Sequence, residues 1–320
     1  MTWKVLLIGL GDIGFKYDLK EPKNIVQTHA RAFDLHDKFE LVGGIDPSIE
    51  NREKFEESYG ICTFKNIISA FESMKADVVV IASPTNFHLE NLKEVLLCCK
   101  PKVILMEKPA AYLKEEAHEM SRMSLKSSVP ILINLVRRVD ISVKEIMKKI
   151  NKGVIELPCK GVVWYSKGLI HNACHFIDLL SLWLGAPKKI DVLNPGRKIN
   201  DFDCEPDLCV YFSDSSVYFL AIDNEDFSYY NIELLAKNGK LNFGNGDVPI
   251  SWQVKSKINS GLEPKFYKII NELHQYQLNI VNDIERFLNN QSILIPTLEA
   301  HIKTLDLVYE STSIIRMNNE

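Results

Sequence analysis

A chain of 320 residues is long enough for two domains of ordinary size, and its 46% hydrophobic and 25% charged residues are the balance of a soluble globular protein. The net charge of −4 argues against nucleic-acid and membrane partners, because both favour a basic surface. The apolar run Val5–Leu10 is too short to span a bilayer, and Asp12 interrupts it too early for a signal peptide. Seven cysteines without zinc-motif spacing indicate reduced thiols in a cytoplasmic protein.

Short apolar runs alternate with helical patterns in the first part of the chain. The runs are Trp3–Ile8, Phe39–Ile45, Asp77–Ala82, Val103–Met106 and Pro130–Leu135, and Asn51–Tyr59 and His88–Cys99 are among the helical patterns. Continuous β-rich runs separated by helices are typical of parallel strands that are covered on both faces. The pattern predicts a doubly wound α/β sheet in a first domain over residues 1–134.

The rhythm changes in residues 135–320, where strand-like runs follow one another without helices between them. We expect helices at Val139–Ile150, Cys174–Leu184, Phe266–Asn289 and Thr297–Ile315, and strands at Lys160–Tyr165, Cys209–Phe212, Val217–Ile222, Tyr229–Leu235 and Lys240–Phe243. Asn238-Gly239 is a two-residue hairpin signal. The pattern predicts a second, α+β domain with a mostly antiparallel sheet, and leaves open whether its last helices pack back on the first domain.

The sequence GLGDIG at residues 9–14 follows the first predicted strand and fits the GxGxxG pattern of a Rossmann dinucleotide-binding turn. In such a turn Gly9 permits the tight bend, Gly11 lets the backbone approach the pyrophosphate, and Gly14 lets helix and strand pack closely. A helix that opens at Asp12 and Ile13 would add amide donors for the phosphates. We therefore expect these five residues to bind a cofactor; the alternative is a structural glycine turn.

Asp46 ends the second predicted strand, where an acidic side chain accepts hydrogen bonds from the adenosine ribose. It lies 32 residues after Gly14, so we infer an insertion at Lys16–Gln27. A carboxylate repels a 2′-phosphate, and no basic residue follows before Arg52. The sequence therefore favours NAD, with NADP left open. Asp46 before Pro47 also suits an Asx turn, which is the structural alternative.

Four further segments carry a resemblance to a known family. They are DVVVIASPTNFH at 77–88, EKP at 107–109, HNACHFIDLL at 171–180 and FLNNQSILIPTLEAHIKTLDLVYES at 287–311. Together they resemble the Gfo/Idh/MocA oxidoreductases, a family of the glucose-fructose oxidoreductase and inositol dehydrogenase type. The resemblance implies an NAD(P)-dependent enzyme whose second domain carries an open sheet that is used for homodimer or homotetramer contacts.

By this resemblance, Lys108 of the Glu-Lys-Pro motif reaches the substrate hydroxyl beside the nicotinamide, where an amine can donate or relay a proton. Glu107 is expected beside the cofactor, paired with a backbone amide or a basic side chain rather than catalytic. The resemblance also implies a cis Lys108–Pro109 peptide. The structural alternative for Lys108 is an ordinary surface lysine.

The resemblance implies that His175 takes the hydroxyl proton as hydride leaves carbon. The structural alternative is a core histidine at the start of an apolar helix. The family carries Asp four residues earlier, where this sequence has His171, so His171 either orients His175 or contacts substrate with Asn172. The i, i+4 spacing of the histidines also suits zinc, but no Glu follows His171, and we expect no metal site.

Several other residues are candidates for lining the site. Lys167 suits an anionic or polar group of the substrate, Ser83, Pro84 and His88 suit cofactor contacts after the third predicted strand, and Arg137 and Arg138 suit a phosphate or carboxylate if they are not ordinary surface arginines. We expect His29 to have a packing role.

The motifs and the family resemblance together imply hydride transfer between nicotinamide and a secondary alcohol or ketone of a sugar, polyol or sugar nucleotide, with a carbohydrate as the small-molecule partner. Two alternatives remain. One is a redox-neutral sugar-modifying enzyme that retains its NAD through turnover. The other is a non-catalytic sensor that binds NAD(P) and a partner protein; the presence of Lys108 and His175 argues against it.

Overall fold

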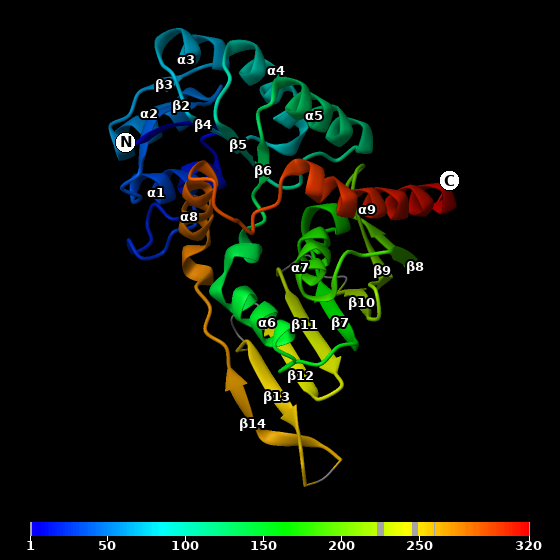
Figure 1. The fold of residues 1–320 in the computed structure, drawn as a ribbon. Coiled ribbons are helices and arrows are strands. Elements are labelled where there is room, and N and C mark those ends of the chain that lie inside the picture. The colour runs from blue at the N-terminus through cyan, green and yellow to red at the C-terminus, as the bar shows by residue number, and fades with distance from the viewer. Residues whose placement is uncertain (1, 223–226, 245–248, 259, 320) are drawn as a thin grey trace. The chain divides into compact units, whose positions relative to one another are not determined.

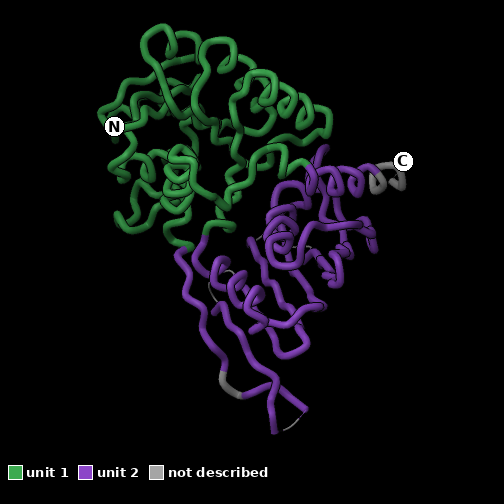
Figure 2. The backbone as a smooth tube through the Cα atoms, viewed as in Figure 1, with its two compact units in different colours: residues 1–139, 273–302 green, residues 140–272, 303–320 purple. Residues whose placement is uncertain are grey.

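The computed structural model describes residues 2–222, 227–244, 249–258 and 260–319. The chain divides into two compact units, which Figure 2 distinguishes by colour. Unit 1 comprises residues 1–139 and 273–302, and unit 2 comprises residues 140–272 and 303–320. No helix in the described part of the chain is both long enough and apolar enough to cross a membrane.

Unit 1 is built on a parallel sheet of six strands in the order β3-β2-β1-β4-β5-β6 (Figure 1). The strands are β1 (Trp3–Ile8), β2 (Phe39–Ile45), β3 (Thr63–Phe64), β4 (Val78–Ile81), β5 (Val103–Met106) and β6 (Ile131–Ile133). Every residue of β4, β5 and β6 is buried, which explains why these strands read as continuous apolar runs rather than alternating ones. The predicted doubly wound parallel sheet is confirmed.

Six α-helices and three short 3-10 turns of unit 1 lie in the described part of the chain, and α1, α2 and α3 begin at side-chain caps. They are α1 (His29–Asp34), α2 (Ile49–Tyr59), α3 (Ile67–Ser73), α4 (His88–Cys98), α5 (Lys114–Ser127) and α8 (Tyr276–Leu288), with short 3-10 turns η2 (Thr85–Phe87), η3 (Val136–Val139) and η5 (Leu273–Gln275). The side chains of Thr28, Ser48 and Asn66 accept backbone amides at the starts of α1, α2 and α3.

The helix that we predicted to open at the glycine-rich turn is only a five-residue π turn, η1 (Asp12–Lys16). The reason lies in Asp18, whose buried carboxylate accepts hydrogen bonds from the amides of Gln27 and Thr28 and from the Thr28 hydroxyl at 2.8–2.9 Å. This carboxylate folds the inserted segment back on itself, so the first α-helix starts at His29 instead.

Unit 2 contains a sheet of eight strands in the order β14-β13-β12-β11-β7-β10-β9-β8. They are β7 (Cys159–Tyr165), β8 (Lys189–Lys198), β9 (Cys204–Tyr211), β10 (Ser216–Ala221), β11 (Tyr230–Ala236), β12 (Gly239–Gly244), β13 (Ser251–Lys255) and β14 (Leu262–Lys268). The pairings are antiparallel apart from the parallel pair β7–β10, so the predicted mostly antiparallel sheet is confirmed. The predicted hairpin is present, but its loop is Lys237-Asn238, because Ala236 pairs with Gly239.

The predicted helix Phe266–Asn289 is wrong over its first part. Phe266 and Tyr267 belong to β14, where they pair with Gln253 and Trp252 of β13, and the helix begins only at Tyr276. A short apolar run fits either periodicity, and here the free edge of β13 decides in favour of a strand. Strands β8 and β13 were not predicted either.

Three helices and one π turn complete the fold: α6 (Ile141–Asn151), η4 (Leu169–Ala173), α7 (Cys174–Leu184) and α9 (Leu298–Asn319). Helix α7 is almost entirely buried and lies on one face of the unit 2 sheet. Its Phe176 ring contacts Tyr230 of β11, and its Trp183 ring contacts Phe243 of β12. This helix therefore starts, at Cys174 and His175, against the covered face of the sheet.

Candidate functional site

The glycine-rich turn after β1 has a backbone that only glycine accommodates. Gly9 has a φ of +96°, and a Cβ at this position would lie 2.6 Å from the backbone of Ala82 and Ser83. A Cβ at Gly14 would collide with the Gly9 carbonyl oxygen, whereas a Cβ at Gly11 would meet no atom within 4 Å. The turn is thus compact on its protein side and open at Gly11, as an approaching phosphate requires.

Asp46 connects this turn to the start of α2. One carboxylate oxygen accepts a hydrogen bond from the Leu10 amide at 2.8 Å, and the other accepts from the Ser48 amide at 2.8 Å. The second contact is the Asx turn that the sequence left open as an alternative. Arg52 donates to the backbone oxygens of Asp46 and Pro47, at 2.8 and 3.1 Å. A ribose contact by Asp46 stays a prediction.

His88 connects the loops that follow β4 and β5. Its ring nitrogens lie 2.9 Å from the carbonyl oxygen of Ser83 and 3.0 Å from that of Ala110. Burial lowers the pKa of the imidazole, although the two carbonyls favour the protonated ring. Asn91 adds a 2.8 Å hydrogen bond to the Ser83 hydroxyl. His88 thus fixes the backbone beside Pro84; its contribution to cofactor binding stays a prediction.

Glu107 and Lys108 follow β5, and the Lys108–Pro109 peptide is cis, as predicted. The Glu107 carboxylate is buried and lies 2.8 Å from His29 Nε2. Asn134 Nδ2 donates to the same oxygen at 2.5 Å, and the Lys108 amide donates to the other oxygen at 3.2 Å. The packing role expected for His29 was therefore incomplete, because its ring also binds a buried carboxylate. No sequence feature singled out Asn134.

The pKa of Glu107 is lowered by its neighbours. Burial, the largest single influence, opposes ionisation, but the hydrogen bond and charge of His29, the Asn134 amide and the Lys108 charge together outweigh it. Glu107 is therefore an anion at neutral pH, held directly beside the Lys108 backbone.

In unit 2, the candidate residues of the histidine motif lie on one short segment that leads into α7. Lys167 is half-buried and has a φ of +67°. His171 is exposed in the π turn η4, whereas His175 is buried in the first turn of α7. Asn172 is buried and donates a 2.6 Å hydrogen bond to the carbonyl oxygen of Ser166. The segment thus exposes His171 and buries its two neighbours in the motif.

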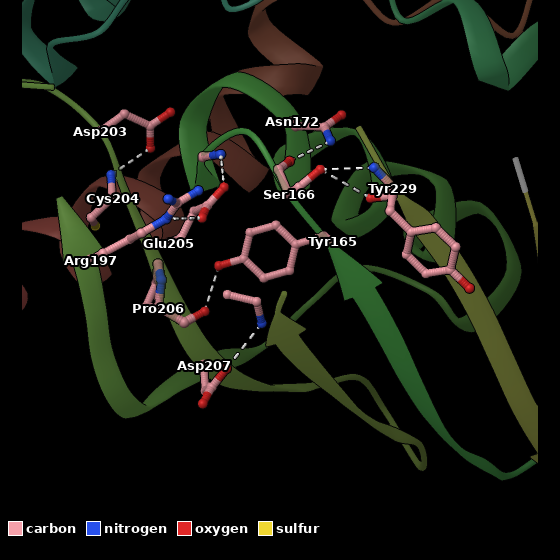
Figure 3. Close-up of polar contacts among 12 residues, drawn as sticks. Tyr165, Ser166, Asn172, Arg197, Asp203, Cys204, Glu205, Pro206, Asp207 and Tyr229 are labelled. Carbon is pink, nitrogen blue, oxygen red and sulfur yellow. Dashed lines mark hydrogen bonds and ion pairs between the residues drawn. The ribbon is translucent and has the colours of Figure 1, made fainter. Parts of the chain in front are cut away.

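Two buried carboxylates hold this segment: Asp203, directly before β9, and Glu205, in β9. Figure 3 shows both side chains and some of their contacts. Asp203 accepts hydrogen bonds from the amides of Ile170 and His171, each at 2.9 Å. Glu205 accepts from the Gly168 amide at 3.1 Å and from Arg197 Nε at 2.7 Å. Burial raises the pKa of Asp203, although the amides that it accepts act in the opposite direction.

Neither carboxylate was predicted as part of the site. The sequence does hold a signal: Asp203, Glu205 and Asp207 recur at every second residue, so they share one face of a strand next to apolar residues. Buried carboxylates at a strand period require partners, and here most of these partners are backbone amides of the histidine segment.

The candidate cofactor residues gather at one edge of the unit 1 sheet. The glycine-rich turn, Asp46, Ser83–Pro84 and Glu107–Lys108 follow the carboxyl ends of β1, β2, β4 and β5, which are adjacent in the order β2-β1-β4-β5. Ligands of open parallel sheets bind at this edge. In the described residues, no group of three or more His, Cys, Asp or Glu side chains is placed to hold a metal ion.

These features define a dinucleotide-binding α/β protein. Residues 3–135 match the family model described as "Oxidoreductase family, NAD-binding Rossmann fold". This part of the chain is therefore similar to the NAD-binding domain of the Gfo/Idh/MocA oxidoreductases. The NAD-binding Rossmann domain predicted from the motifs is thereby confirmed, and the predicted resemblance to this family is confirmed over residues 3–135.

The chain is similar to glucose-6-phosphate 3-dehydrogenase of Bacillus subtilis, with 32% identity over 109 residues, which are 33% of this chain and 30% of that protein. A solved oxidoreductase of Desulfitobacterium hafniense, described as NADPH-dependent, superposes with a TM-score of 0.81 at 17% identity, over 99% of this chain and 96% of that one. The WlbA dehydrogenase of Bordetella pertussis, solved with NADH and UDP-GlcNAcA, superposes with a TM-score of 0.75 at 16% identity, over 98% of this chain and 97% of that one.

The curated relatives match over less than half of their own length. At identities of 15–17%, the solved structures show that the fold is shared over nearly the whole chain.

Proposed function

We propose that this protein is an NAD-dependent dehydrogenase or reductase that transfers a hydride between nicotinamide and a secondary alcohol or ketone of a sugar, polyol or sugar nucleotide. The observation that carries the proposal is the gathering of the glycine-rich turn, Asp46, Ser83–Pro84 and Glu107–Lys108 at the carboxyl edge of an NAD-binding Rossmann sheet. The similarity to a glucose-6-phosphate 3-dehydrogenase and the UDP-GlcNAcA complex of a structural neighbour support a carbohydrate substrate.

The proposed acid–base groups are Lys108 and His175. The amine of Lys108 handles the proton of the substrate oxygen, and the imidazole of His175 accepts it as hydride leaves carbon. Lys167, His171 and Asn172, which lie on the same segment as His175, are the proposed substrate-binding residues. NAD supplies the hydride chemistry, and the chain supplies position and charge.

We propose NAD rather than NADP as the preferred cofactor because the side chain at the end of β2 is a carboxylate. The basic side chain of Arg52, which follows on α2, donates to backbone carbonyls of the same turn. It is therefore already engaged, whereas a 2′-phosphate needs a basic partner at this position.

We further propose that the open face of the unit 2 sheet mediates a homodimer or homotetramer. Helix α7 covers one face, and large side chains on the other face are exposed: Trp164 by 42%, Tyr218 by 42% and Leu235 by 53%. Strand register places these residues on one side of the sheet. Val162 pairs with both Tyr218 and Glu233, and Trp164 and Leu235 each lie two residues further along from Val162 and Glu233, so they share the same face. Light scattering at micromolar concentration tests the proposal; a monomer contradicts it.

We propose a cytoplasmic location, where thiols are kept reduced, because none of the seven described cysteines forms a disulfide. Separation of the protein between cytoplasmic and exported fractions of its own cells tests this proposal.

The proposed activity is tested by mixing purified protein with NAD+ and D-glucose, D-glucose 6-phosphate, myo-inositol or UDP-GlcNAcA, and following absorbance of the reduced nicotinamide. Reduction with at least one of them supports the proposal. If calorimetry shows NAD binding but no carbohydrate is oxidised and no NADH is consumed with the matching ketones, the sensor function replaces it. Reduced cofactor that stays bound while the sugar changes supports the redox-neutral alternative.

A further inference from the structure

The Glu107 carboxylate joins four parts of unit 1. It contacts His29 at the start of α1, Asn134 after β6, and the backbone of Lys108 in its own loop. Asn134 in turn donates to Gln277 of α8 at 3.3 Å. His29, Asn134 and Gln277 are each at most 1% exposed. A polar network that converges on one buried carboxylate is therefore hydrogen-bonded to the backbone of the loop that carries Lys108.

Packing alone does not explain this network. Burying a carboxylate costs several kcal/mol unless partners compensate it, and replacement by well-packed apolar groups is often neutral or stabilising. The network is also imperfect, because His29 Nδ1, Asn134 Oδ1 and Gln277 Nε2 are buried without hydrogen-bond partners. A set of polar groups with unpaired buried atoms contributes little to stability, so its role lies in what Glu107 holds.

Glu107 holds the amide of Lys108, and it does so as an anion. His29 and Asn134 both donate to Oε1, which leaves Oε2 for the Lys108 amide. Other titratable groups whose charges interact with this carboxylate are His88 of α4 and Tyr276 of α8; burial first, and then the Glu107 charge, raise the pKa of Tyr276. The two donors on Oε1 fix the orientation of the carboxylate and therefore of the loop backbone.

We propose that His29 and Asn134 are positioning residues for Lys108, acting through Glu107. This inference rests on the proposed function, in which the Lys108 amine meets the substrate hydroxyl. The charge of the Lys108 ammonium already acts on the Glu107 carboxylate. Without a donor at position 29, Oε1 is available to pair with this ammonium, and such a pair draws the amine away from its working position. An error of about 1 Å in such a group costs on the order of 100-fold in rate.

The first test needs no substrate. Lys108 is labelled with acetic anhydride at several pH values, and its labelling rate is compared with that of the exposed Lys126 in the same molecule. In His29→Leu, the Lys108/Lys126 ratio should fall by about threefold or more, because a closer carboxylate keeps the amine protonated to higher pH. His29→Gln, which retains a donor, should restore most of the ratio.

A matched control removes another histidine–glutamate contact of the same unit. His36 Nε2 lies 3.5 Å from Glu285, and its ring packs on Phe39 at the amino end of β2, the opposite edge of the sheet from Lys108. His36→Leu should therefore leave the Lys108 labelling ratio unchanged, even if the melting temperature falls. Asn134→Ala serves as a second probe and decides the matter if His29→Leu does not fold.

The second test uses turnover with a carbohydrate found to be oxidised. His29→Leu and Asn134→Ala should lower kcat by about 10- to 100-fold with little change in the Kd for NAD. If both variants keep the wild-type labelling ratio and kcat and only melt earlier, the residues are structural and the inference is overturned. If no carbohydrate is oxidised but labelling responds as described, the proposed function fails while the positioning of Lys108 by His29 stands.

Discussion

The two candidate loops of this protein reach fixed geometries by opposite means. The turn after β1 is shaped by missing side chains, since Gly9 and Gly14 each stand where a Cβ would collide with neighbouring backbone. The segment before α7 is shaped by added side chains, since Asp203 and Glu205 accept the amides of Gly168, Ile170 and His171. Such close packing adds no charge and leaves space for a ligand at Gly11, whereas buried carboxylates hold a segment firmly but introduce charge.

Charge makes the second device sensitive to its surroundings. The pKa of Asp203 is raised chiefly by burial, whereas that of Glu107 in unit 1 is lowered because its partners outweigh burial. The two carboxylates therefore act on stability with opposite dependence on pH. Substitutions at His175, at the two carboxylates, at Asp46 and at His171 test whether the two loops differ in this way.

The largest effect is expected at the residue that the carboxylate-held segment leads into. His175→Ala should lower turnover by about 10²- to 10⁴-fold, the usual contribution of a general acid or base. The Kd for NAD should change little, because the glycine-rich turn belongs to the other unit. Steady-state kinetics and calorimetry measure the two quantities. Turnover near the wild-type value would remove His175 from the mechanism.

The opposite pKa shifts give the next prediction, read from stability against pH. Glu107 has a lowered pKa, so its contribution is present above the ordinary value of 4.5 and is lost as pH falls through the folded value. Asp203 has a raised pKa, so its contribution is full below the ordinary value of 3.8 and is lost as pH rises through the folded value. The stability advantage of wild type should shrink on acidification relative to Glu107→Gln and grow relative to Asp203→Asn.

Urea unfolding between about pH 3.5 and 7 measures both differences. Asp201→Asn is the control, since its side chain is exposed and forms an ion pair with the surface residue Lys198. Slopes of the same sign for the two carboxylate variants would contradict the contrast between the units.

The sequence predicted local features of the fold and the site, but not the contacts between residues that are far apart in the chain. The glycine pattern, the Glu-Lys-Pro motif and the strands β1, β2, β4, β5 and β6 of unit 1 are local features, and the sequence located them; it missed β3, β8, β13 and β14. His29 and Asn134 lie 78 and 27 residues from Glu107, and Asp203 and Glu205 lie 33 and 37 residues from backbone amides that they accept in the histidine segment. Such pairings depend on how the strands are ordered. Short-range patterns also misassigned Phe266–Tyr267, because pairing with the distant strand β13 determines their structure.

A smaller effect is expected at the end of β2, where a glycine-shaped turn meets a carboxylate. Asp46→Ala should weaken NAD binding by about tenfold, the equivalent of one charge-assisted hydrogen bond, and relax selection against NADP. Because Asp46 also accepts the amides of Leu10 and Ser48, thermal stability should fall as well. Ser48→Ala, which removes the α2 cap but keeps the carboxylate, is the control. Tighter binding of NADP than NAD by the wild-type protein would overturn the proposed role of Asp46.

The smallest effect is expected at His171, the one exposed residue among the candidates of the histidine segment whose amide Asp203 already holds. Since the backbone there is fixed by Asp203, a change of the His171 side chain should leave the segment in place. If His171 only orients His175, His171→Asp should change kcat and KM by no more than about twofold. If it contacts substrate, the same change should raise KM with kcat little affected, and more for D-glucose 6-phosphate than for D-glucose, because a new carboxylate repels a phosphate. Kinetics with this matched pair of sugars separates the roles, and a large fall in kcat with both sugars would contradict them together.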